Sequence, residues 1–144
     1  MPYKQEVASL TQVSPKTASQ LVAEAKQQIE NVAPESVAEE AASGALLVDL
    51  REPEERQQNG CIAGSVSAPR GMLEFWADPS SPYHREEFRP DARIVLYCAS
   101  GGRSALAGAT LAQLGYTDIA HLDGGFEAWK GAGLPVEKPQ QPER

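Results

Sequence analysis

The sequence predicts an α/β domain in which an open, mainly parallel sheet has helices on both faces. Short continuous apolar runs, which mark strands covered on both sides, occur at 46–50 and 94–97. Helical segments follow these runs, and glycines such as Gly44, Gly60 and Gly115 close the connections. Sheets of this kind bind ligands beyond the carboxyl ends of their strands.

Two helices are expected before the first strand. The earlier one has a start signal at Ser14 and Pro15, a serine N-cap followed by proline, and its apolar face extends to Ile29. We interpret this N-terminal helix as an added packing or dimerisation element, so a homodimer through it is one expected assembly. The second helix is expected from Pro34 to Ser43.

The rest of the chain alternates between strands and helices. Strands are expected at 46–50, 66–68, 94–97 and 119–122, and helices after Glu52, over 103–114 and after Asp123. Residues 72–92 are expected to form a short helix and a long loop, and loops of that length are often functional.

Length, composition and charge limit the function classes. The 144 residues suggest one compact domain, with 41% hydrophobic and 23% charged residues. No apolar run approaches the roughly 20 residues that cross a bilayer, so no membrane partner is expected. Thirteen basic against twenty acidic residues give a formal charge of −7, which argues against nucleic acid as a partner. The absence of a secretory signal and the presence of only two cysteines favour the cytoplasm.

Residues 98–104, CASGGRS, place a thiol at the carboxyl end of a strand and directly before a helix. A helix N-terminus and nearby cations stabilise a thiolate. The small residues Ala99, Ser100, Gly101 and Gly102 allow the backbone to curl, so that several N–H groups converge on the Cys98 sulfur. The pattern therefore predicts an anion-binding loop around a nucleophilic cysteine, and the alternative is a buried structural cysteine.

Two segments of the chain resemble the two halves of a rhodanese-like domain, the single-domain sulfurtransferase module. They are LLVDLREPEERQQNGCIAGSVSAPRG and VLYCASGGRSALAGATLAQLGYTDIAHLDGGFEAWKGAGLPVE. The resemblance divides the chain into an N-terminal extension with one helix (1–31), a rhodanese-like domain (32–137) and a tail expected to be disordered (138–144). It implies a parallel sheet of about five strands, with the cysteine loop at its carboxyl edge.

The resemblance also implies the enzymatic activity of a sulfurtransferase. Such proteins take a sulfane sulfur from an anionic donor onto the loop cysteine as a persulfide and pass it to cyanide or a thiol. Cys98 is then the sulfur acceptor, the backbone from Ala99 to Ser104 cradles the persulfide, and Arg103 adds positive charge. Thiosulfate is favoured over mercaptopyruvate as the sulfur donor. A small redox protein is one expected thiol acceptor, and no cofactor is implied.

Two other functions remain open on the same scaffold. The phosphatases and arsenate reductases of this fold have a wider loop, whereas only four residues separate Cys98 from Arg103. This spacing favours sulfur over phosphorus. The other alternative is a non-catalytic sulfur-carrier or partner-binding module, against which the intact cysteine argues.

Supporting residues are expected near the same edge of the sheet. Arg70 follows the strand at 66–68 and either binds the anionic donor or pairs with a surface acid. Asp49 and Arg51 match the Asp-x-Arg element of the family and are interpreted mainly as a structural ion pair. Cys61 is expected at the opposite edge from Cys98, so we predict no disulfide between them. The histidines and cysteines lack metal-ligand spacing, so no metal site is expected.

Overall fold

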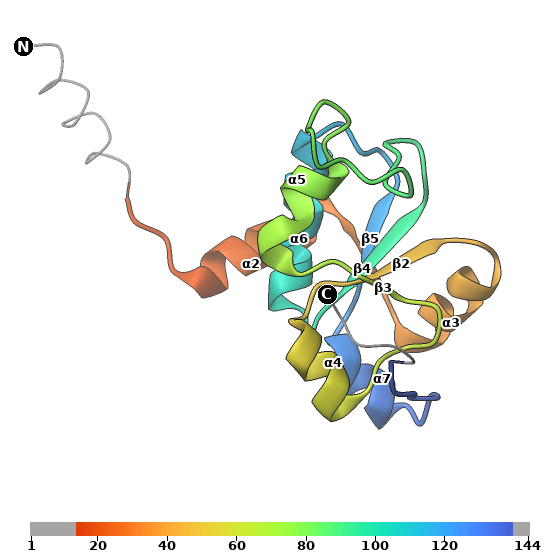
Figure 1. Ribbon diagram of the computed structural model, residues 1–144. Coiled ribbons are helices and arrows are strands. Elements are labelled where there is room, and N and C mark those ends of the chain that lie inside the picture. The colour runs from red at the N-terminus through yellow and green to blue at the C-terminus, as the bar shows by residue number, and fades with distance from the viewer. Residues whose placement is uncertain (1–13, 140–144) are drawn as a thin grey trace, which may run out of the picture.

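The computed structural model describes residues 14–139 and contains a five-stranded sheet between two layers of helices (Figure 1). The strand order is β1-β5-β4-β2-β3, and all neighbouring strands are parallel. The strands are Glu30–Val32 (β1), Leu46–Asp49 (β2), Val66–Ser67 (β3), Ile94–Tyr97 (β4) and Ile119–Leu122 (β5). The predicted fold class is confirmed.

The helices divide between the two faces of the sheet, as Figure 1 shows. One layer contains α2, α5 and α6, which are Ala18–Gln28, Leu73–Ala77 and Gly102–Gln113. The other contains α3, α4 and α7, which are Pro34–Ala42, Pro53–Asn59 and Gly125–Gly131. A short 3-10 helix, η1 (Arg70–Met72), leads into α5. No helix within residues 14–139 is long and apolar enough to cross a membrane.

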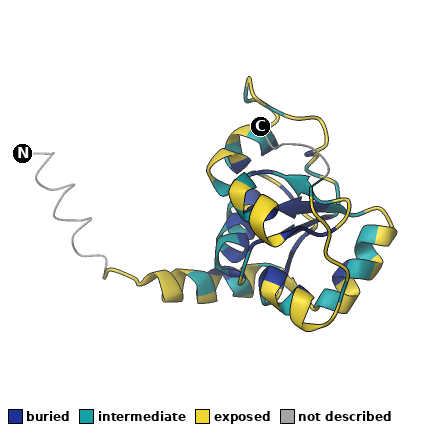
Figure 2. Cartoon of the chain, turned by 60° about the horizontal axis from the view of Figure 1, so that its bottom comes forward, coloured by how far each residue is buried: buried dark blue, intermediate teal, exposed yellow. Residues whose placement is uncertain are grey.

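The central strand β4 faces both layers in alternation. Ile94 and Leu96 belong to the apolar cluster that α5 and α6 cover, whereas Val95 and Tyr97 belong to the cluster that α3 and α7 cover. Figure 2 shows the strands buried beneath helices that are exposed on their outer sides. Continued alternation directs the next side chain, Cys98, toward the α6 layer.

The segment before β2 differs from the expectation in two respects. The helix α2 begins at Ala18 rather than after Ser14, because Thr17 and Gln20 form a capping box. The Gln20 N–H donates to Thr17 Oγ1 at 3.0 Å, and the Thr17 N–H donates to Gln20 Oε1 at 2.8 Å. A strand, β1, also separates the two helices, and it is too short to show a periodic pattern in sequence.

The expected domain boundary between residues 31 and 32 lies inside β1, which joins the sheet beside β5. The family-based division into extension, domain and tail remains a sequence prediction. Residues 1–13 of the expected extension and 140–144 of the expected tail lie outside the described residues.

Candidate functional site

The loop that follows β4 wraps backbone N–H groups around the Cys98 sulfur. The N–H groups of Gly101 and Ser104 donate to Sγ at 3.2 and 3.4 Å. Gly101 is the N-cap of α6 and has a φ of 109°, a left-handed conformation that glycine adopts without the strain of a side chain. Two of the amides expected from the sequence, those of Gly101 and Ser104, therefore point at the sulfur, and they favour negative charge there.

The first turn of α7 holds the other side of this loop. The N–H groups of Phe126 and Glu127 donate to the carbonyl oxygens of Cys98 and Ala99 at 2.8 and 3.0 Å. Gly125 lies so close that a Cβ there would be 2.7 Å from the Cys98 carbonyl oxygen. The loop carbonyls thus face α7, while its N–H groups remain available to the sulfur.

Polar side chains connect the sulfur to the interior of the sheet. Cys98 Sγ donates to Ser104 Oγ at 3.6 Å, and Ser104 Oγ lies 2.8 Å from His121 Nδ1. His121 lies on β5 beside Asn31 of β1, and its Nε2 is 2.7 Å from Asn31 Oδ1. Burial lowers the pKa of His121, so the ring is neutral at neutral pH.

Arg103 is the cation nearest to the loop in sequence, and it is paired with Glu55 of α4. Two guanidinium nitrogens donate to the two carboxylate oxygens at 2.8 and 3.1 Å. This bond is the main cause that raises the pKa of Arg103, and interaction with Cys98 adds to the shift. The same bond lowers the pKa of Glu55. Arg103 therefore lies beside the sulfur but shares its charge with a carboxylate.

Arg70 is paired with a surface acid, which is one of the two contacts expected from the sequence, and its binding of a donor stays a prediction. Its guanidinium donates to Glu74 at 2.8 Å and to Thr110 Oγ1 at 3.4 Å. Thr110 lies six residues beyond Ser104 on α6, about 9 Å along the helix axis. The structure thus joins Arg70 to a surface acid and to the middle of α6, rather than to the cysteine loop.

Asp49 and Arg51 form a buried ion pair at the end of β2. Arg51 Nη2 donates to Asp49 Oδ2 at 2.8 Å and to the Gly60 carbonyl oxygen at 2.8 Å. Its guanidinium also lies 4.3 Å from the centre of the Phe126 ring on α7. Because Phe126 in turn bonds the Cys98 carbonyl, the pair supports the cysteine loop indirectly.

Cys61 and Cys98 are both free and buried. Burial raises the pKa of the Cys61 thiol, and the nearby charges of Arg56 and Asp49 also act on it. The Gly60 carbonyl accepts from Arg51 at 2.8 Å and the Ile62 N–H donates to Tyr97 Oη at 3.2 Å, so residue 61 lies close to the carboxyl ends of β2 and β4. This differs from the opposite-edge placement expected from sequence. Ile62, the residue after Cys61, belongs with Tyr97 to the apolar cluster on the α7 side of the sheet, whereas Cys98 contacts Ser104 of α6 on the other side. The sheet therefore lies between the two thiols.

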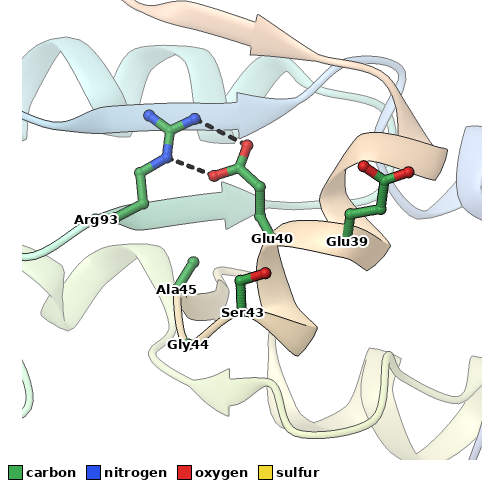
Figure 3. A pocket seen from close by; sticks show the side chains of 6 residues that line it. All are labelled: Glu39, Glu40, Ser43, Gly44, Ala45 and Arg93. Atoms are coloured by element: carbon green, nitrogen blue, oxygen red, sulfur yellow. Dashed lines mark hydrogen bonds and ion pairs between the residues drawn. The ribbon is translucent and has the colours of Figure 1, made fainter.

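A surface cavity of about 370 Å³ lies at the other end of the sheet (Figure 3). Arg93, which directly precedes β4, donates to Glu40 at 2.6 and 2.9 Å across this cavity. The same guanidinium contacts Glu30 and Asp118 at 3.0 Å each. Three carboxylates around one guanidinium leave no net positive charge for an anion. The cysteine loop is therefore the better candidate for the active site.

Sequence reasoning missed three side chains of this site. Glu55 was not distinguished from the other acids of its helix, and Asn31 lay in a segment without a strand pattern. His121 was considered only as a metal ligand, although a histidine inside the apolar run at 119–122 was a signal of a buried polar contact. Within residues 14–139, no cluster of three or more potential metal ligands occurs.

The comparisons with known proteins agree with this geometry. The model of the rhodanese-like domain matches residues 33–132. A sulfurtransferase of Allochromatium vinosum is 38% identical over 95 residues, which is 66% of this chain and 80% of that protein. The thiosulfate sulfurtransferase GlpE of Pseudomonas aeruginosa is 33% identical, over 70% of this chain and 84% of its own.

Two solved structures are also similar. A Rhodopseudomonas palustris protein of unknown function, described as a possible tyrosine phosphatase, has a TM-score of 0.80 and 41% identity, with 87% and 97% of the two chains covered. The polysulfide-sulfur transferase homodimer of Wolinella succinogenes has a TM-score of 0.67 and 26% identity, with 85% and 88% covered. The named relatives support a sulfurtransferase. With the family model covering most of the chain and the cysteine loop in place, this protein belongs to the rhodanese-like domain family.

Proposed function

We propose that the protein takes the sulfane sulfur of thiosulfate onto Cys98 and passes it to a thiol or to cyanide. The observation that carries this proposal is the pair of N–H groups, from Gly101 and Ser104, aimed at Sγ. Preorganised amides stabilise an anionic sulfur without rearranging during the reaction. The relative named thiosulfate sulfurtransferase supports the choice of donor.

The transfer has two half-steps. In the first, the Cys98 thiolate attacks the outer sulfur of thiosulfate, a sulfur–sulfur bond forms, and the electron pair of the broken bond leaves with sulfite. In the second, a thiolate or cyanide attacks the outer persulfide sulfur, and the Cys98 sulfur departs with its electron pair. Both half-steps place negative charge inside the same loop, so one set of amides serves both.

Thiosulfate carries two negative charges, and Arg103 is the cation that supports its binding. The guanidinium interacts with Cys98 while it remains paired with Glu55. A donor anion would therefore share Arg103 with Glu55 or displace that carboxylate. Arg70 would need to leave Glu74 in order to contribute.

The test compares wild type with Cys98→Ser and with Cys61→Ala, which removes the other thiol of the chain. Each protein is incubated with thiosulfate, its intact mass is measured, and thiocyanate formed from cyanide is quantified. Wild type and Cys61→Ala are expected to gain one sulfur atom and to form thiocyanate, whereas Cys98→Ser does neither. If wild type gains no sulfur and forms no more thiocyanate than Cys98→Ser, thiosulfate is not the donor. Activity with mercaptopyruvate alone would assign the protein to the other donor class.

A phosphatase is the second candidate, because the 41% identical Rhodopseudomonas palustris protein is described in those terms. The spacing of four residues between Cys98 and Arg103 disfavours it, since a phosphate needs a wider loop than a single sulfur atom. Hydrolysis of p-nitrophenyl phosphate by wild type, and not by Cys98→Ser, would reverse this preference. The alternative of a non-catalytic module is excluded if wild type, but not Cys98→Ser, turns over thiosulfate or p-nitrophenyl phosphate.

We also propose a small redox protein as thiol acceptor, a reducing cytoplasmic location, and a homodimer formed through α2. The free thiols support a reducing compartment. The outward side of α2 supports the dimer, since Leu21 is 44% exposed there. Sedimentation of wild type and Leu21→Glu tests it, and a wild type that stays monomeric at every concentration refutes it.

A further inference from the structure

A chain of hydrogen bonds leads from the buried Cys98 sulfur to the edge strand β1. It passes from Sγ to Ser104 Oγ (3.6 Å), on to His121 Nδ1 (2.8 Å), and from His121 Nε2 to Asn31 Oδ1 (2.7 Å). Cys98, Ser104 and His121 are buried. The amide cradle does not require His121 or Asn31, so their alignment with the sulfur has a separate explanation.

The direction of these hydrogen bonds follows from the β1 end. The side-chain nitrogen of Asn31 donates to the carbonyl oxygens of Lys26 and Ile29 at 2.9 and 3.1 Å, which turns its oxygen toward His121. This oxygen can only accept, so His121 Nε2 carries a hydrogen. In a neutral ring Nδ1 then has the free lone pair, and it accepts the hydrogen of the Ser104 hydroxyl.

The Ser104 hydroxyl has one hydrogen and two acceptors within reach. His121 Nδ1 lies at 2.8 Å and the Gly101 carbonyl oxygen at 3.3 Å, so the shorter bond to the ring takes the hydrogen. The oxygen then has lone pairs left to accept from the Cys98 thiol. Every donor between the sulfur and the ring thus points toward the ring.

The surroundings of the ring keep it neutral in the resting enzyme, so the lone pair of Nδ1 is free to accept a hydrogen. Burial lowers the pKa of His121, the Asp123 carboxylate opposes this shift, and the Lys26 ammonium adds to it. These charged groups act from the turn after β5 and from α2. Ser104 of α6 and Asn31 of β1 are its hydrogen-bond partners, and its neighbour on β4 is the apolar Leu96.

We propose that Ser104 and His121 relay the Cys98 proton, and that Asn31 holds His121 in the tautomer that the relay needs. The proposal rests on the proposed sulfur transfer and adds the path of its proton. His121 is a positioning residue, because it acts on the sulfur only through Ser104. Asn31 precedes the matched range of 33–132, so the relay gives the strand before that range a role in the site.

The proton moves balance over the two half-steps. In the first, the S–H bond breaks, Ser104 Oγ takes that proton, and its own proton moves to His121 Nδ1. The Cys98 sulfur keeps the electron pair and attacks the donor. In the second half-step the sulfur leaves the persulfide with its electron pair, and the two proton moves reverse. No hydrogen bond is lost, since only the donor and acceptor roles exchange.

His121→Asn tests the relay, because its neutral side chain cannot take up a proton. His84→Asn is the matched control, since His84 is the other histidine of the chain and bonds the Phe88 carbonyl instead. Two rates are measured against pH: single-turnover sulfur uptake from thiosulfate, and alkylation of Cys98 by iodoacetamide, quantified on its peptide.

We expect both rates of His121→Asn to fall by about 100-fold near neutral pH, the low end of general acid–base catalysis. The affinity for thiosulfate should not change. The deficit should narrow as the pH rises, because hydroxide then takes over the role of the missing base. His84→Asn should follow the wild-type profile throughout.

A His121→Asn profile that runs parallel to wild type at every pH overturns the relay, because a structural defect slows the reaction without regard to pH. Nitrogen NMR of wild-type His121 needs no variant: hydrogen on Nε2 is expected, and hydrogen on Nδ1 overturns the proposal. Alkylation requires no sulfur donor. If wild type takes no sulfur from thiosulfate, the proposed function fails, while the alkylation profile still decides the relay.

Discussion

Removing the charge of Glu55 tests how far its ion pair limits the charge that Arg103 offers to an anionic donor. The pair is bidentate, with N–O distances of 2.8 and 3.1 Å. The side chains of Arg103 and Glu55 are 38% and 31% exposed, so water and salt screen them. In the wild type, Glu55 Oε1 accepts a hydrogen bond from the Glu52 N–H at 2.9 Å, which caps α4. Glu55→Gln removes the charge but keeps a side-chain oxygen that can accept this bond, so the cap is retained.

Two effects set the magnitude of the change. A partly exposed ion pair is worth roughly 0.2–1 kcal/mol, so releasing Arg103 favours donor binding by up to that amount. A carboxylate about 8 Å from a dianion in water repels it by about 1 kcal/mol before screening. After screening, the KM for thiosulfate is expected to fall about 3- to 10-fold at low ionic strength. The kcat should change little, since Cys98 and its amides are untouched.

The assay is the initial rate of thiocyanate formation over a range of thiosulfate concentrations, at low and high salt. Glu54→Gln is the matched control, because Glu54 is an exposed acid in the same first turn of α4. The advantage of Glu55→Gln over this control should shrink as salt is added. A KM for Glu55→Gln that equals or exceeds that of the control would refute the reasoning, because Arg103 would then not meet the donor.

Three further predictions concern stability and the thiols. Gly125→Ala places a Cβ 2.7 Å from the Cys98 carbonyl oxygen at a φ of +65°. We expect the variant to lose sulfur transfer, and we expect the strained φ alone to lower its free energy of unfolding by about 1–3 kcal/mol. Normal activity together with normal urea unfolding would contradict this expectation. The hydrogen bond from Arg93 lowers the pKa of Glu40, so this carboxylate stabilises the fold above pH 4.5 and the contribution is lost as the pH falls through the lowered pKa. Glu40→Gln should therefore flatten the acid loss of thermal stability, and an unchanged acid slope would count against the ion pair. Peptide mapping after mild oxidation should find no Cys61–Cys98 link, and a linked peptide would show that the sheet does not keep the thiols apart.

Much of the fold could be predicted because its strands are locally encoded. The apolar runs at 46–49 and 94–97 are buried on both faces, as their lack of polar alternation predicted. The edge strand β1 could not be predicted, because its three residues become a strand only through pairing with β5. The predicted start of α2 at Ser14 and Pro15 was wrong, because the capping box of Thr17 and Gln20 starts the helix at Ala18.

The residues of the candidate site also fall into two groups, those placed by local sequence and those placed by tertiary contacts. Cys98 and the amides around it are neighbours in the chain, so small residues and a helix start were enough to predict their convergence. The Arg103–Glu55 bond joins residues 48 positions apart, and the His121–Asn31 bond joins residues 90 positions apart. Their local sequence carries no sign of these partners.

The sequence by itself thus determined the parallel α/β class, the cysteine loop and its place at a strand end, because backbone geometry within a few residues depends on those residues. Only the tertiary structure decided which carboxylate shares Arg103 and which side chains line the path behind the sulfur. Those contacts depend on strand order and helix packing, which bring together segments that the chain keeps far apart.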